Sequence, residues 1–112
     1  MSGIQTLRRI YQFLSAFFSG RGGRRNIIFK DDRGKPHVFV PKHNLHLLGN
    51  IAKQRKLLMK AVDSKTGTVT ALRANPNGTV YEQVTTLNGY SVTIRYFESK
   101  SGLIEINTAF IP

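Results

Sequence analysis

Two patterns of apolar and polar positions divide the chain. From residue 68 onward the period is two, which is typical of half-buried strands. In two earlier segments, 4–18 and 45–62, apolar residues recur at intervals of three and four, which is the spacing of an amphipathic helix. The pattern therefore predicts helices first and strands afterwards.

Turn residues separate the strands that are expected in the second half. Asn77-Gly78 and Asn88-Gly89 are hairpin signals, because both residue types tolerate a positive φ angle. We expect an antiparallel meander with strands at 68–73, 79–86, 90–97 and 103–110, and two shorter strands at 27–29 and 38–40 around a turn at 31–34. The expected fold class is α+β, with N-terminal helices packed on one face of a mainly antiparallel sheet of four to five strands.

The chain is expected to divide near residue 25. Residues 1–25 are predicted to form an amphipathic helix and a basic, glycine-rich hinge, and residues 26–112 the folded domain. A signal peptide is the alternative for the first segment, but Gln12 and Ser15 interrupt its short apolar stretch. In the second helix Asn44 is a candidate cap, while Gly49 and Asn50 favour a later start.

The composition excludes some chemistry and indicates a polyanionic partner. The 112 residues include no Cys, so disulfides, zinc–thiolate sites and Cys nucleophiles are excluded. The net charge is +11, and residues 1–62 carry all of it, with 13 Lys or Arg against two Asp. Nucleic acid, anionic lipid or an acidic protein would be attracted, unless the charge is a plain solvated surface. No apolar run approaches the ~20 residues that span a membrane, so stable membrane insertion is not expected.

All three histidines, His37, His43 and His46, fall within ten residues. A metal site is not expected, because the surrounding charge is positive and would repel a divalent cation. Surface histidines at a strand-to-helix corner are the plain alternative. His43 and His46, three residues apart, would share a face if they lie on a helix. Because His both takes and gives protons near neutral pH, the cluster also suits acid–base catalysis.

RNA cleavage without a metal or cofactor fits such a cluster. RNA supplies its own nucleophile, the ribose 2′-OH, and the protein adds a base, an acid and cations for the phosphate. In the strand 90–97, Arg95 alternates with Thr93 and Ser91 and would form a phosphate-binding row. Thr108 interrupts the apolar last strand. The residues expected to bind RNA are Lys53, Arg55, Lys56, Arg73 and Thr93.

Three stretches resemble a known family: Pro41-Lys42-His43-Asn44-Leu45, Gly89-Tyr90-Ser91-Val92-Thr93-Ile94-Arg95, and Ile106-Asn107-Thr108-Ala109-Phe110-Ile111-Pro112. Together they are similar to the C-terminal ribonuclease toxin domains of bacterial polymorphic and contact-dependent growth inhibition toxins, which have the barnase/EndoU/colicin E5–D/RelE-like fold. The resemblance covers roughly residues 36–112. Residues 1–35 lie outside it.

The resemblance implies a toxin that is delivered from the cell surface, cuts RNA, often tRNA, in the cytoplasm of a target bacterium, and is neutralised by an immunity protein. By position, His43, Arg95 and Thr108 match its catalytic residues, and Lys42 lies in the same motif. His46 has no counterpart, and Tyr96 replaces a small residue. The net charge predicts that the immunity protein is acidic.

The expected mechanism assigns a role to each of these residues. His43 would act as the base on the 2′-OH, and Arg95 with Lys42 would hold the phosphate. Thr108 would position an oxygen, and His46 or His37 would donate the proton. Two alternatives are an RNA-binding module without activity and a membrane-active toxin that acts through residues 4–18.

Overall fold

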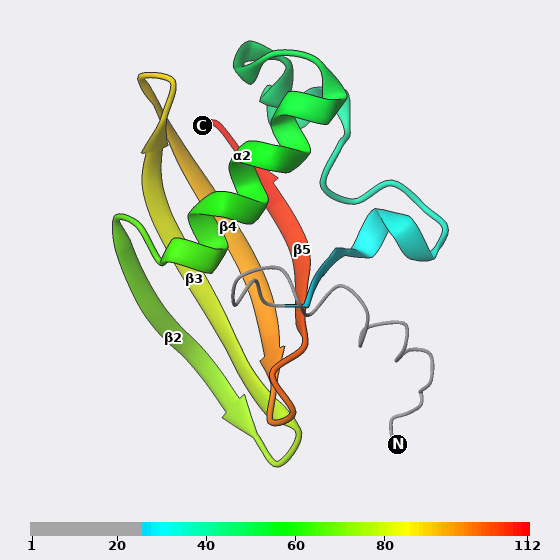
Figure 1. Cartoon of the computed structure of the whole chain (residues 1–112), viewed down its shortest axis with the longest axis vertical. Coiled ribbons are helices and arrows are strands. Elements are labelled where there is room, and N and C mark those ends of the chain that lie inside the picture. The colour runs from blue at the N-terminus through cyan, green and yellow to red at the C-terminus, as the bar shows by residue number, and fades with distance from the viewer. Residues whose placement is uncertain (1–25) are drawn as a thin grey trace.

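The computed structural model describes residues 26–112, which form a five-stranded sheet and one α-helix (Figure 1). The strand order is β1-β5-β4-β3-β2. The bounds are Ile27–Phe29 for β1, Ile51–Ser64 for α2, Thr68–Asn75 for β2, Gly78–Leu87 for β3, Tyr90–Ser99 for β4 and Ile104–Phe110 for β5. Residues 1–25, with the predicted helix and hinge, lie outside the described residues.

The α+β class and the antiparallel meander β2–β5 are confirmed. The sheet is nevertheless mixed, because β1 pairs with β5 in parallel. The expectation of N-terminal helices is also poorly matched: the α-helix of the described residues is central, between β1 and the meander. No helix within residues 26–112 is long and apolar enough to cross a membrane.

The helix α2 starts at Ile51, later than the periodicity predicted. Asn50 is the N-cap, and its side chain accepts a hydrogen bond from the Lys53 backbone N–H at 2.9 Å. Leu45–Leu48 form a separate 3₁₀ helix, η4, ahead of Gly49. The prediction that Asn44 caps the long helix was therefore wrong: Asn44 adopts a left-handed conformation with φ 62°, between η4 and the 3₁₀ helix η3, Pro41–His43.

The predicted strand at 38–40 does not form. The backbone N–H groups of Val38 and Phe39 donate to the Asp31 carboxylate, at 2.8 and 3.0 Å, instead of to a neighbouring strand. Asp31 lies in the 3₁₀ helix η2, Lys30–Arg33, which replaces the expected turn. A local carboxylate thus takes the donors that a sheet would have used.

The core lies between α2 and one face of the sheet (Figure 1). The alternation in β4 is confirmed, because Val92, Ile94 and Tyr96 are fully buried. Gln83 of β3 is also fully buried, and its amide donates to the carbonyls of Ala61 and Thr66, at 2.9 and 2.7 Å. These bonds tie the end of α2 to the sheet.

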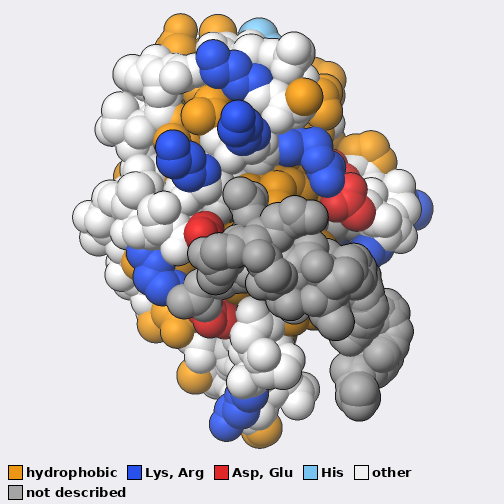
Figure 2. Space-filling model, viewed as in Figure 1, with side chains coloured by type: hydrophobic (Ala, Val, Ile, Leu, Met, Phe, Trp, Pro, Cys, Tyr) orange, Lys and Arg blue, Asp and Glu red, His pale blue; other side chains and the backbone are white. Residues whose placement is uncertain are grey.

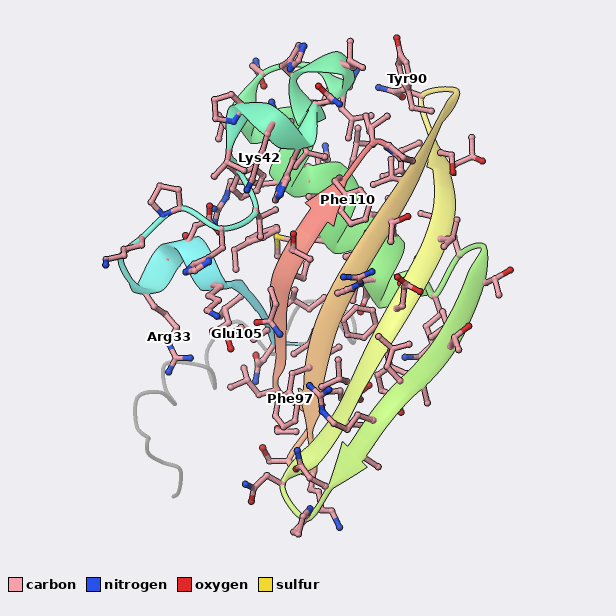
Figure 3. The ribbon with its side chains drawn as sticks, turned by 180° about the vertical axis from the view of Figure 1, so that it is seen from behind. Arg33, Lys42, Tyr90, Phe97, Glu105 and Phe110 are labelled. Atoms are coloured by element: carbon pink, nitrogen blue, oxygen red, sulfur yellow. The ribbon has the colours of Figure 1, made fainter. Side chains whose placement is uncertain are left out.

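The opposite face of β2, β3 and β4 carries no helix in the described part of the chain, and we call it the open face (Figure 3). Its β4 positions, Thr93, Arg95 and Phe97, are all partly or fully exposed. The packing of α2 on one side therefore leaves a surface on the other side that a ligand can reach.

Candidate active site on the open face

The strand register sets a row of polar side chains across the open face. The two-residue turn Asn88-Gly89 pairs Leu87 with Tyr90, and the same register brings Glu82 opposite Arg95. The pairing continues to β2 and β5, so that the row contains Thr70, Glu82, Arg95 and Thr108. A bulge in β5 next to Thr108, where the register shifts, lets both Ile106 and Ala109 stay in the core.

Arg95 forms an ion pair with Glu82. Its Nε and Nη2 atoms both lie 3.0 Å from Glu82 Oε2. The side chains are 48% and 27% exposed, so water screens the pair and it stabilises the fold by only about 0–1 kcal/mol. The guanidinium has five N–H donors, and those on Nη1 remain for an anion.

Arg95 and His43 both lie close to the ring of Phe110. The Arg95 Cζ atom is 5.8 Å from the centre of the Phe110 ring, and the His43 ring centre is 6.1 Å from it. Thr93, the cross-strand partner of Phe110, belongs to the next row of the same face. The structure thus brings His43, Arg95, Thr108 and Thr93, four residues singled out from the sequence, to one region.

Backbone contacts fix the position of His43. Its carbonyl accepts from the Ile111 N–H at 2.9 Å, and the Asn44 amide donates to the Ile111 carbonyl at 3.0 Å, so η3 is bound to the end of β5. His43 Nδ1 lies 2.9 Å from the Val38 carbonyl oxygen. A carbonyl oxygen only accepts, so Nδ1 carries the proton and Nε2 is left for proton transfer.

Two further predicted residues lie on the same side of the molecule. Lys42 is exposed in η3, and Figure 3 places it at the same end of the sheet as Phe110. Arg73 is exposed in β2 and pairs with Val80, which is opposite Phe97. Both side chains can therefore meet a ligand that extends across this face.

Lys53, Arg55 and Lys56 lie on α2 and so on the other side of the sheet. Figure 2, viewed onto α2, shows Lys and Arg side chains gathered there, and Lys53 and Lys56 line a hollow in the α2 surface. Arg55 is engaged within the fold: it makes two 3.1 Å hydrogen bonds to Asp32 and its Cζ stacks 4.6 Å above the centre of the Phe29 ring. These three residues do not meet Arg95.

The three histidines do not converge. His46 lines a hollow with Pro41, Ile51 and other residues, and His37 lines a different one beside η2. His43 and His46 do not lie on one helix, because the left-handed residue Asn44 separates η3 from η4. Within residues 26–112 no three His, Asp or Glu side chains are grouped closely enough to hold a metal ion.

Sequence reasoning missed Glu82 and Phe110. Glu82 could have been found from the sequence. The two-residue turn Asn88-Gly89 fixes the hairpin register, and this register places Glu82 opposite Arg95. The position of Phe110 relative to Arg95 was harder to foresee, because it depends on the β5 bulge.

The pKa of the Asp31 carboxyl is lower than the usual value of this group. Partial burial raises the pKa of this carboxyl, but hydrogen bonds from backbone N–H groups, chiefly those of Phe39 and Val38, outweigh burial, and the net pKa is lowered. Asp31 thereby holds the segment that leads to His43, whose Nδ1 bonds Val38.

Comparison with protein-family models, with curated proteins and with solved structures gives no significant match. The proposed chemistry is therefore argued from the residues of this chain.

Proposed function

We propose that the chain is a metal-independent endoribonuclease and that the open face is its active site. The observation that carries the proposal is the arrangement around Arg95. A carboxylate, Glu82, bonds the guanidinium directly, and an anchored imidazole, His43, lies close to the same Phe110 ring that the guanidinium approaches. For a phosphate bound to Arg95, we assign Glu82 as the proton acceptor and His43 as the proton donor.

The two proton-transfer roles follow from the contacts. Glu82 is paired with Arg95 as a carboxylate, and a carboxylate accepts a proton but has none to give. We therefore assign Glu82 as the base that takes the proton of the ribose 2′-OH. The sequence alone had suggested His43 for this role. The 2′-oxygen attacks phosphorus, the bond to the 5′-oxygen breaks, and protonated His43 gives its Nε2 proton to that oxygen. The products are a 2′,3′-cyclic phosphate and a free 5′-OH.

The remaining residues stabilise and position the substrate. Arg95 neutralises the charge that develops on the phosphate oxygens, with Lys42 as a second cation. Thr108, opposite Arg95 in the row, offers a hydroxyl hydrogen bond to the phosphate. Phe110 and Phe97 present aromatic surfaces on which unpaired bases stack, as is common in proteins that bind single-stranded RNA.

The biological role in the proposal is that of an antibacterial toxin. Its support is the resemblance of residues 36–112 to ribonuclease toxin domains, which favours tRNA as the substrate and the cytoplasm of a competing bacterium as the place of action. The net charge of +11 favours an acidic immunity protein that covers Lys42 and Arg95.

The test is cleavage of total bacterial RNA by the purified chain in excess chelator. His43→Ala and Glu82→Gln should each slow product formation by about 10²–10⁴-fold, the usual contribution of one acid or base. Lys60→Ala, on the exposed side of α2, is the matched control and should cut like the parent. Thermal unfolding of each variant shows whether the fold is kept.

Two results would overturn the proposal. One is discrete cleavage by a folded Glu82→Gln or His43→Ala protein at the parental rate. The other is tight, salt-sensitive binding of RNA by the parent with no product, even after cell extract is added, which would identify an RNA-binding module without activity.

A further inference from the structure

A second cationic site lies at the edge of the sheet, beside η2. A hollow of about 520 Å³ is bordered by Lys30, Arg33, Gly34, Lys35, His37 and Glu105, and we call it the η2 pocket. Figure 3 shows Arg33 and Glu105 at this edge. Its volume is in the range of sites that hold small ligands, about 300–1,000 Å³.

The acidic residues near the η2 pocket leave most of its positive charge uncompensated. Asp31 accepts hydrogen bonds from Val38 and Phe39, and Asp32 is paired with Arg55. Among the described residues, Glu105 is the one acid that borders the pocket. Three permanent cations, Lys30, Arg33 and Lys35, thus face a single carboxylate from this part of the chain.

Glu105 also orients one of these cations. Its Oε2 atom accepts a hydrogen bond from Arg33 Nη1 at 2.8 Å, and the Arg33 side chain remains 67% exposed. A guanidinium held on one side by a carboxylate keeps its other donors for a phosphate, and the same arrangement occurs at Arg95. The η2 pocket therefore repeats the main anion-binding feature of the active site.

The strand register links the pocket to the active site. Glu105 of β5 is the cross-strand partner of Phe97, which lies two residues from Arg95 on the open face. One interstrand step of about 4.8 Å and two residues along a strand, about 6.6 Å, separate the backbone positions of Glu105 and Arg95. An extended nucleic-acid strand can cover such a distance with about one or two nucleotides.

We infer that the η2 pocket is a second phosphate-binding subsite for the same RNA strand that is cut at Arg95. The inference rests on the proposed function and specifies its substrate. The enzyme acts on a single-stranded or loop segment with at least two phosphates, one at Arg95 and one in the η2 pocket, with Phe97 between them as a stacking surface.

The first test measures binding and does not depend on cleavage. A fluorescent 2′-O-methyl RNA decamer, which lacks the 2′-OH nucleophile, is titrated over a range of salt concentrations. Arg33→Gln with Lys35→Gln should weaken binding several-fold and reduce the slope of log K against log salt by about 0.7 for each phosphate that the protein no longer neutralises. Lys60→Gln with Lys100→Gln removes the same charge elsewhere and should leave the slope unchanged.

The second test measures kcat/KM on a dinucleoside monophosphate, which has one phosphate, and on the unmodified decamer. The Arg33/Lys35 variant should lose about 10-fold on the decamer and less than twofold on the dinucleoside. An unchanged salt slope, or equal losses on both substrates, would overturn the subsite. If the parent cuts neither substrate, the proposed function fails, whereas the salt slope still reports on the η2 pocket.

Discussion

Arg95 is exposed enough for a ligand to reach it, and its pairing with Glu82 adds little to folding stability. Arg95 contributes to anion binding through its geometry, because the planar guanidinium presents two hydrogen-bonding edges. One edge bonds Glu82, and the other is left for a phosphate. A lysine would supply the charge but not this fork. The identity of the residue thus matters more to anion binding than to the fold.

Asp31 is a residue whose charge matters to the fold. Its carboxylate bonds the backbone of Val38 and Phe39, and these bonds lower its pKa despite partial burial. A carboxyl whose pKa is lower in the folded than in the unfolded state stabilises the fold at any pH above its unfolded pKa of ~3.9. This stabilisation is lost as the pH falls through the lower, folded pKa.

Asp31→Asn should therefore lower the free energy of unfolding by about 1–2 kcal/mol at pH 7, because two hydrogen bonds lose their charged acceptor. The difference from the parent should shrink as pH falls below about 4. Urea unfolding followed at pH 7 and pH 3 checks both statements. A constant difference at the two pH values would mean that the Asp31 charge does not stabilise the segment 37–40.

At the scale of elements, the sequence predicted what depends on local signals. The four meander strands follow from alternation, and the register of the β3–β4 hairpin follows from the turn at Asn88-Gly89. The β2–β3 turn is formed by Pro76-Asn77, one residue earlier than the predicted Asn77-Gly78, and Gly78 is already the first residue of β3. The parallel pairing of β1 with β5 joins residues 77 positions apart, such as Ile27 and Ile104, and no local pattern specifies it.

Two elements were predicted wrongly, because alternation and periodicity describe the side chains and not the hydrogen-bond partners or the φ angles of the backbone. The run 38–40 has strand-like residues, but Asp31 takes its N–H groups. The segment 45–48 has helical periodicity, but Gly49 has a φ angle of 127°, which separates it from α2. Periodicity thus identified which side chains are buried, such as Leu45 and Leu48, without identifying the element that buries them.

The start of α2 can be tested through its cap. Asn50→Ala removes the acceptor for the Lys53 N–H and should lower the free energy of unfolding by about 1 kcal/mol. Asn50→Asp replaces the amide oxygen with a carboxylate oxygen that can accept the same hydrogen bond, so this variant should retain most of the stability. Denaturant unfolding of both variants is the measurement. Equal losses in the two variants would show that the cap hydrogen bond is not the cause.

At the scale of the whole molecule, the sheet separates two basic surfaces. The surface of α2 carries Lys53 and Lys56, and the open face carries Arg95 with Glu82, while His43 contacts Phe110. Net charge and residue spacing singled out basic residues on both surfaces without distinguishing them. Only the fold shows which residues lie together, and it adds Glu82 as a group for the chemistry.

The most direct test of the account uses one RNA oligonucleotide in two forms, in excess chelator. One form is all-ribose, and the other has a single 2′-deoxy nucleotide at the site where the first is cut. If the 2′-OH is the nucleophile, the ribose form gives a product ending in a 2′,3′-cyclic phosphate, and the deoxy substitution abolishes cleavage there. Cleavage of both forms at the same position and rate would contradict attack by the 2′-OH, and with it the proposed ribonuclease mechanism.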